Sequence, residues 1–288
     1  MNSTLSNKLA ESLAASAPGR AYVLVDGALC PDMRLRDPLG VDVARLPVPG
    51  ISDEESTRAL PMLLAWPEDA ALRDWLLYRT MLWAEEQHAA TWLRSSENLQ
   101  ALAHRLGLGI AALLDDGIEV LLRIADARVL RAMHDTLEPA QRASLFGGIQ
   151  GWWYLDREET LQSLPPDAAP AAPAAPAASF PLTLTQAQLD SLLQAAEPDF
   201  VMKVLYDSFP GTLDELPRVQ RHAFVRRQIE AARRAWGLER VIDFASFCVL
   251  VQRHGEDFSN RLAWQGLRER VKSGRMSWLE ALAQGEGE

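Results

Sequence analysis

The stretch EVLLRIADARVLRAMHDTLEPAQRASLFGGIQGWWY, residues 119–154, decides the fold of the first half of the chain. It opens with an apolar run, passes through the close charges Arg123, Asp126 and Arg128, and continues with helical spacing of apolar residues. Pro139 suits the start of a second helix, where its missing N–H costs nothing. The run then closes in an aromatic cluster typical of a strand. The order strand, helix, helix, strand predicts a mixed α/β layer.

Short apolar runs earlier in the chain predict further strands. They are AYVLVDGAL (21–29), LPMLLAW (60–66), AATWLRS (89–95) and the hairpin GIAALLDDGIEVLLRI (109–124), which turns at Asp116–Gly117. Helical segments separate them. Asp69 is placed to cap a helix over 70–87, and Ser95 or Ser96 to cap a helix over 97–107 that ends at Gly107.

A Pro/Ala-rich segment, LPPDAAPAAPAAPAASFP at residues 164–181, marks the clearest boundary in the chain. Proline fixes φ and lacks a donor, so this composition favours an extended, semi-rigid spacer of about 3.1 Å per residue. We therefore expect an α/β domain over 1–160, a linker over 161–181 and a helical domain over 182–288. The predicted class is α+β followed by an all-α bundle.

The region after the linker carries only helical patterns. Thr185 is placed to cap its first helix and Pro217 lies near the start of a later one. Pro198 lies inside the first helix and either kinks it or divides it in two. The predicted helix stops are Gly237, Gly255 and Gly274.

Composition narrows the classes of partner. The formal net charge of −10 argues against nucleic acid and against an anionic membrane surface as ligands. Cys30 and Cys248 have no redox or metal-binding spacing, which predicts ordinary buried thiols in a reducing compartment. No secretory leader and no run of about 18 apolar residues occurs. We expect a soluble, cytoplasmic protein.

The sequence carries no recognisable catalytic or cofactor motif. There is no Gly-x-Ser-x-Gly elbow, no Cys–His pairing and no glycine-rich phosphate loop that opens a helix. Each histidine falls on a predicted helix without the spacing of metal ligands. The histidines are His88, His104, His134, His222 and His254. We therefore expect no catalytic residue, no cofactor and no metal site.

Two features remain as candidate partner-binding elements. The first is the charged corner, in which Asp126 is placed to cap the helix that follows it while Arg123 and Arg128 pair with its carboxylate. The second is a set of strand tryptophans, Trp66, Trp92, Trp152 and Trp153. Because Trp152 and Trp153 are adjacent on a strand, they point to opposite faces. Either both faces are covered, or one tryptophan is an anchor in a protein-binding groove.

The segments YVLVDGA, LPMLLAW, WLRSSENLQALAHRL and LLRIADARVLRAMHDTLEPAQRASLFGGIQGWW resemble, in order and spacing, the domain of the type VI secretion effector chaperones, or adaptors. The resemblance covers roughly residues 20–155. In the family's charged block, Arg123, Asp126 and Arg128 match, whereas the aromatic and proline positions carry Ile and Ala here. The helical region beyond the linker also resembles the C-terminal extension of many such adaptors.

The resemblance implies a protein that binds one toxic effector in the cytoplasm and helps to load it onto the VgrG/PAAR spike. Its expected partners are therefore the effector and a spike protein. The main alternative is an enzyme or toxin of hydrolase type that uses Asp26 or Asp126 as a general base. A third reading, nucleic-acid binding through the Arg-rich helix 217–236, suits the sequence poorly because its arginines are spread around the helix and the chain is acidic.

Overall fold

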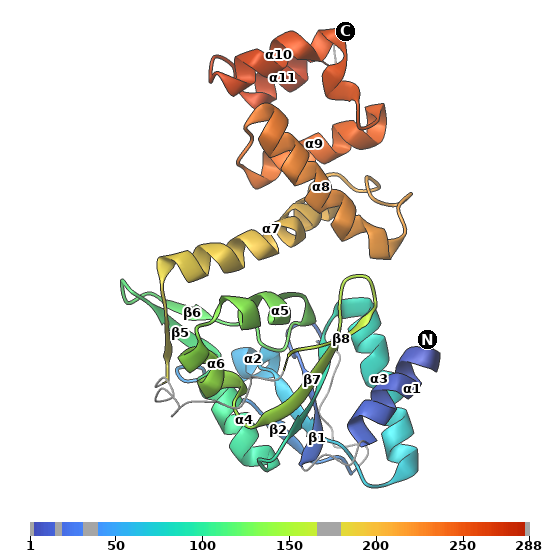
Figure 1. The fold of residues 1–288 in the computed structure, drawn as a ribbon, viewed down its shortest axis with the longest axis vertical. Helices are drawn as coiled ribbons and strands as arrows, with labels where there is room; N and C mark the ends of the chain where they lie inside the picture. Colours follow the sequence, from blue (N-terminus) through green and yellow to red (C-terminus); the bar gives the residue numbers. More distant parts are fainter. Residues whose placement is uncertain (1–2, 15–18, 31–39, 166–179, 286–288) are drawn as a thin grey trace. The chain divides into compact units, whose positions relative to one another are not determined.

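The computed structural model describes residues 3–14, 19–30, 40–165 and 180–285 (Figure 1). The chain forms two compact units, residues 1–192 and 193–288. The first unit contains all the strands that the structure describes, and the second is helical. This confirms the predicted class, a sheet-containing N-terminal part followed by a helical C-terminal part.

A six-stranded sheet forms the centre of the first unit, in the order β2–β3–β1–β4–β7–β8. Every pair of neighbouring strands in it is antiparallel. The strands are β1 (Arg20–Val25), β2 (Val43–Arg45), β3 (Met62–Ala65), β4 (Ala90–Ser95), β7 (Ile149–Leu155) and β8 (Leu161–Ser163). The predicted strands at 21–29, 60–66 and 89–95 are confirmed.

A second, three-stranded sheet has the order β6–β5–β9. It consists of β5 (Ala111–Leu114), β6 (Glu119–Leu121) and β9 (Leu182–Leu184). Strands β5 and β6 form the predicted hairpin, and Gly117 at its turn has φ +85°, a left-handed conformation that glycine adopts without a Cβ penalty. Strand β9 pairs parallel with β5.

The helices of the first unit begin at identifiable caps. They are α1 (Ser3–Ala14), α2 (Glu54–Ala59), α3 (Ala70–Gln87), α4 (Leu99–Leu108), α5 (Ala127–Thr136) and α6 (Pro139–Phe146). Asp69 caps α3 as predicted, since its carboxylate accepts from the Leu72 N–H at 2.9 Å. The predicted cap and stop of α4 were wrong.

Asn98 caps α4 in place of Ser95 or Ser96, accepting from the Ala101 N–H at 2.9 Å. Ser95 is still part of β4, and its hydroxyl bonds to the Gly148 carbonyl. Gly107 lies inside α4 and does not end it. A Cβ at this position would stand 2.5 Å from the Pro47 carbonyl oxygen, which explains why the residue is glycine. Glycine here permits close packing of two backbones, a role that its sequence context does not distinguish from a helix stop.

Alternate residues of the central strands enter two separate cores. Tyr22 of β1 and Trp152 of β7 pack with α4, α5, α6 and the second sheet. Val23 of β1 and Trp153 of β7 pack on the other face, with α1 and α3. Figure 1 shows the sheet between these two groups of elements. Both faces are covered, so the period of two along each strand divides apolar residues between two cores.

The boundary between the units differs from the one predicted from the Pro/Ala-rich segment. Strand β8 (Leu161–Ser163) pairs with β7, and β9 (Leu182–Leu184) pairs with β5, so residues on either side of that segment belong to the first unit. The division falls at residues 192/193 instead. The predicted extended spacer itself lies outside the described residues, since 166–179 are not described.

The second unit is built from helices. They are α7 (Gln186–Ser208), whose first residues belong to unit 1, then α8 (Arg218–Trp236), α9 (Val241–His254), a short 3-10 turn (Phe258–Asn260), α10 (Leu262–Lys272) and α11 (Trp278–Gly285). Thr185 caps α7, accepting from the Gln188 N–H at 3.2 Å. Helix α7 continues through Pro198 as one helix, so the proline does not divide it.

An aromatic cluster fills the core of the second unit. Trp236 packs edge-on against Trp264 and Trp278, with ring centroids 6.0 and 4.9 Å away. Phe258 packs on Trp264 at 5.2 Å, and the Trp278 indole donates to the Ser246 hydroxyl at 2.7 Å. Edge-to-face rings at these separations add to the stabilisation from burial.

Two buried tryptophans of the first unit each donate their indole N–H to a threonine hydroxyl. Trp152 donates to Thr91 at 2.9 Å, and Trp92 donates to Thr80 at 3.1 Å. We predict that Thr91→Val lowers the free energy of unfolding by about 1–3 kcal/mol, because it leaves the buried Trp152 N–H without an acceptor while keeping volume and β-branching. Urea denaturation measures the change.

Thr183→Val in β9 is the matched control. It makes the same isosteric change on an exposed strand position, and we expect a change within about 0.5 kcal/mol. Equal effects of the two substitutions would contradict a specific contribution from the Thr91 hydroxyl.

Candidate functional site

Four charged side chains meet at one edge of the first unit, and we call this group the Asp–Arg corner. Asp26 follows directly after β1, and Arg123 lies two residues beyond β6. Asp126 is the N-cap of α5, and Arg128 lies in the first turn of that helix. The segments come from distant parts of the chain, since 97 residues separate Asp26 from Arg123.

The geometry of the corner confirms the predicted pairing and adds Asp26 to it. Arg128 binds Asp126 bidentately, with Nε–Oδ1 at 2.9 Å and Nη2–Oδ2 at 2.7 Å. Its backbone N–H donates to the same carboxylate at 3.0 Å, which is the helix cap. The Nη2 of Arg123 lies 3.0 Å from Asp26 Oδ2 and 3.6 Å from Asp126 Oδ2. One guanidinium therefore lies between two carboxylates.

Backbone contacts fix the two carboxylates in place. Asp26 Oδ1 accepts from the N–H groups of Ala28 and Leu29 at 2.9 and 3.2 Å, so Asp26 closes its own turn. The Ala127 N–H at the start of α5 donates to the His88 carbonyl at 3.1 Å. Helix α5 is thereby joined to the C-terminal end of α3 as well as to the corner.

The electrostatics of the corner make Asp126 a weak base. Burial raises the pKa of its carboxyl, but the hydrogen bonds and charge of Arg128 and the charge of Arg123 together lower that pKa by more, so it lies below its usual value. A general base works best with a pKa near the operating pH. Asp126 here caps α5 and binds two arginines.

The strand tryptophans proposed as partner anchors divide by burial. Trp92 and Trp152 are 0% and 1% exposed, and both indole N–H groups are bonded to threonines inside the core. Neither reaches a partner directly, which corrects the prediction for these two residues. Trp66 and Trp153 are partly buried and pack against the core formed with α1 and α3. The sheet is covered on both faces, and a strand pattern alone does not show this.

Helix α3 exposes aromatic side chains that the strand analysis missed. Trp75 and Tyr78 are 38% and 45% exposed. The guanidinium of Arg79 lies 5.3 Å from the centre of the Trp83 ring, a cation–π contact. Spacings of three and four residues place these side chains along one side of the helix. We call the four residues Trp75, Tyr78, Arg79 and Trp83 the α3 aromatic strip. That spacing is visible in the sequence, but the same residues also fit a buried helical face.

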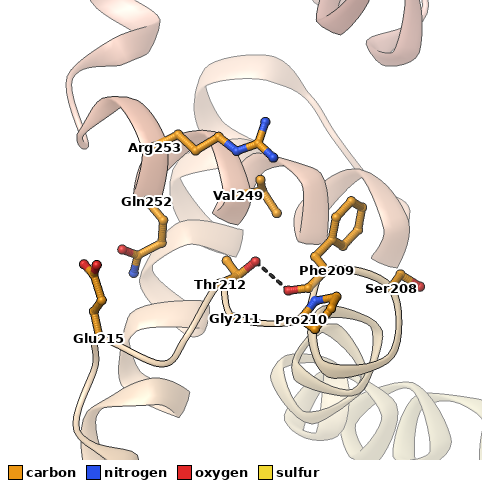
Figure 2. Close-up of a pocket in the computed structure, with 9 residues that line it drawn as sticks. All are labelled: Ser208, Phe209, Pro210, Gly211, Thr212, Glu215, Val249, Gln252 and Arg253. Atoms are coloured by element: carbon orange, nitrogen blue, oxygen red, sulfur yellow. Dashed lines mark hydrogen bonds between the residues drawn. The ribbon is translucent and has the colours of Figure 1, made fainter.

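A cavity of about 460 Å³ lies within the second unit, between the loop after α7 and helix α9 (Figure 2). Phe209 and Thr212 line it from the loop, where the Thr212 hydroxyl donates to the Phe209 carbonyl at 2.7 Å. Glu215, Gln252 and Arg253 bring polar groups to it. It contains no cysteine or histidine, and its hydroxyls have no histidine beside them to act as a base.

Other chemistry-bearing groups are dispersed. Among the described residues, no group of three or more His, Cys, Asp or Glu side chains is arranged to hold a metal ion. In the same part of the chain, no helix combines the length and apolarity needed to cross a membrane. Cys30 and Cys248 are buried, as predicted, and burial raises the pKa of each thiol to about 12. Both are therefore poor nucleophiles at neutral pH.

The Asp–Arg corner makes a pH-dependent contribution to stability. We predict that Asp126→Asn lowers the free energy of unfolding by about 1–3 kcal/mol at neutral pH, because charge-assisted hydrogen bonds from Arg128 are weakened. The lowered pKa means that this contribution is present above the ordinary carboxyl pKa of about 3.9 and is lost as pH falls through the folded value. Chemical denaturation from pH 7 to pH 3 should show the two proteins converging.

Asp135→Asn on the same helix is the control. The Asp135 side chain is 51% exposed and pairs with Arg131 on the surface, so we expect a change below about 0.5 kcal/mol. A constant difference between wild type and Asp126→Asn across the whole pH range would contradict the assignment.

Comparison with known proteins gives a family match over part of the chain. Residues 21–144 match the family model described as Domain of unknown function (DUF4123). No curated protein and no solved structure matched the chain. The DUF4123 family is associated with adaptors of type VI secretion. The match begins in β1 and ends in α6, so it lies within the α/β unit and contains the whole Asp–Arg corner.

Proposed function

We propose that this chain is a non-catalytic adaptor of type VI secretion. In this proposal it binds one toxic effector in the cytoplasm and helps to load it onto the VgrG/PAAR spike. The observation that carries the proposal is the DUF4123 match over residues 21–144, which contains the central β1–β3–β4 strands and the corner. Binding before secretion would keep the effector covered, and it would stabilise the bound state by mass action.

The chemistry of the described residues supports binding over turnover. In the corner, both aspartates are engaged with Arg123, and Asp126 has a lowered pKa. The exposed side chains of the α3 aromatic strip are instead tryptophan, tyrosine and arginine, the residue types that dominate the energetics of protein interfaces. We assign the corner the role of framework and the strip the role of contact surface.

The experiment that tests the proposal is affinity purification of the full chain from its native cells, followed by identification of the proteins retained. We expect a secreted toxin and a VgrG or PAAR protein. Expression of the chain alone in a host without its partners should leave growth unchanged. A growth defect together with turnover by the purified chain would favour the enzyme or toxin alternative.

Variants of the α3 aromatic strip test the contact surface. We predict that Trp75→Ala combined with Tyr78→Ala lowers recovery of the effector about tenfold or more, because exposed aromatic anchors commonly contribute about 2 kcal/mol each at an interface. Unfolding by urea should remain close to that of the wild type, since both side chains are partly exposed.

Tyr206→Ala is the matched control for this pair. Tyr206 is 47% exposed on α7, close to the 45% of Tyr78, so the substitution removes a similar aromatic surface elsewhere. Equal losses of effector with Tyr206→Ala and with the α3 variants would show that α3 has no special part in binding.

A further inference from the structure

Strand β6 is an edge of the second sheet, and its outer side is open. Among the described strands it pairs only with β5. The register places Val120 opposite Ala112, and the flanking bonds run from Leu122 N–H to the Ile110 carbonyl and from Leu114 N–H to the Ile118 carbonyl. In an antiparallel pair the inward-bonding residues alternate with outward-bonding ones. The N–H and C=O groups of Glu119 and Leu121 therefore point away from β5.

The open edge is also apolar. Leu121 is 56% exposed, and Ile118 at the start of the strand is 57% exposed. Val120 and Leu122 face the opposite side of the sheet from Leu121 and pack in the core, and Ile118, one residue before β6, lies on their side. Proteins commonly protect such edges with lysine, proline or a bulge, because unpaired backbone beside apolar side chains recruits another strand. Residues 118–122 contain no lysine and no proline, and their one charged side chain is Glu119, which opposes an acidic strand and favours a basic one.

Acidic side chains surround this edge. Asp115, Asp116 and Glu119 are all exposed around the β5–β6 hairpin. The chain as a whole carries a formal charge of −10. Pairing of two copies through β6 would bring these acids together in like-charged surroundings, which is unfavourable. A strand that carries lysine or arginine would instead meet an opposite charge at Glu119.

We propose that the β6 edge binds an extended segment of the effector by strand addition, and that this segment carries a basic residue and an apolar residue two positions apart, on the face of the strand that Glu119 and Leu121 share. Backbone hydrogen bonds to Glu119 and Leu121 would supply affinity, and side chains beside Leu121 and Glu119 would supply the preference for apolar and basic residues. This inference rests on the proposed adaptor function and names the chemistry of the segment that the adaptor holds.

The probe is a short peptide, blocked at both ends, that repeats Lys-Thr-Val-Thr, so that lysine and valine lie two positions apart on one face. Fluorescence anisotropy compares it with the same peptide carrying glutamate in place of lysine. We expect the lysine peptide to bind about tenfold more tightly, from several favourable cross-strand charge contacts. Amide hydrogen exchange measured on the full chain should show new protection at Glu119 and Leu121 when the lysine peptide is bound.

Two variants separate the backbone contribution from the charge contribution. Leu121→Pro removes an N–H that makes no bond to β5, a position where an edge strand tolerates proline, and it should weaken peptide binding about tenfold. Glu119→Lys should reverse the preference between the two peptides. Glu11→Lys makes the same charge change on an exposed position of α1, and it should leave the preference as in the wild type.

Each outcome decides the inference. Equal binding of the two peptides, binding without protection of Glu119 and Leu121, or no binding would overturn it. Concentration-dependent dimerisation with protection of the same amides, without peptide, would show a second copy on the edge and also overturn it. If Leu121→Pro retains the native effector in full, the strand-addition proposal fails while the adaptor function stands. If no effector is retained by the wild type, it is the adaptor function that fails.

Discussion

The guanidinium of Arg123 lies between the carboxylates of Asp26 and Asp126, and this contact joins the parts of the first unit. Asp26 terminates β1 in the central sheet, Arg123 follows β6 of the second sheet, and Asp126 starts α5. The two carboxylates are 5% and 3% exposed, so each depends on charged and hydrogen-bonding partners, Arg123 among them, to compensate for its lost hydration. Arg128 completes the compensation for Asp126. The two sheets and the helix are thus joined by one charge cluster.

Burial of the central sheet on both faces has a consequence for recognition. Strands β1, β4 and β7 give alternate residues to two cores, so their aromatic side chains contribute to folding and are not free for partners. The two contact surfaces that we propose are the outer side of helix α3 and the open edge of the smaller sheet. Both lie in the first unit, and both combine apolar area with nearby charge.

Much of the local structure could be predicted from sequence. Period-two apolar runs predicted β1, β3 and β4, and Asp69, Asp126 and Thr185 cap their helices as their residue types suggest. Non-local facts could not be predicted this way. Gly107 looks like a stop unless the approach of Pro47 is known, and Asp26 joins the corner because the fold brings it to Arg123 from 97 positions away.

In the candidate site too, the sequence predicted contacts between near neighbours in the chain and did not predict which side chains the fold buries. The pairing of Arg123 and Arg128 with Asp126 depends on residues within a few positions, and the sequence predicted it correctly. The exposure of tryptophans depends on what covers each face. Trp92 and Trp152 are therefore buried although their strands look half-exposed, and Trp75 is partly exposed although its helical spacing suits a core position.

The pairing of β9 with β5 changes what the Pro/Ala-rich segment does for the molecule. The strands on either side of it, β8 and β9, both belong to the first unit, so the segment connects two strands of one unit. The hydrogen bonds between β5 and β9 tie two strands that are distant in sequence into one sheet, so β9 would stay joined to the β5–β6 hairpin even if the covalent chain were cut between β8 and β9.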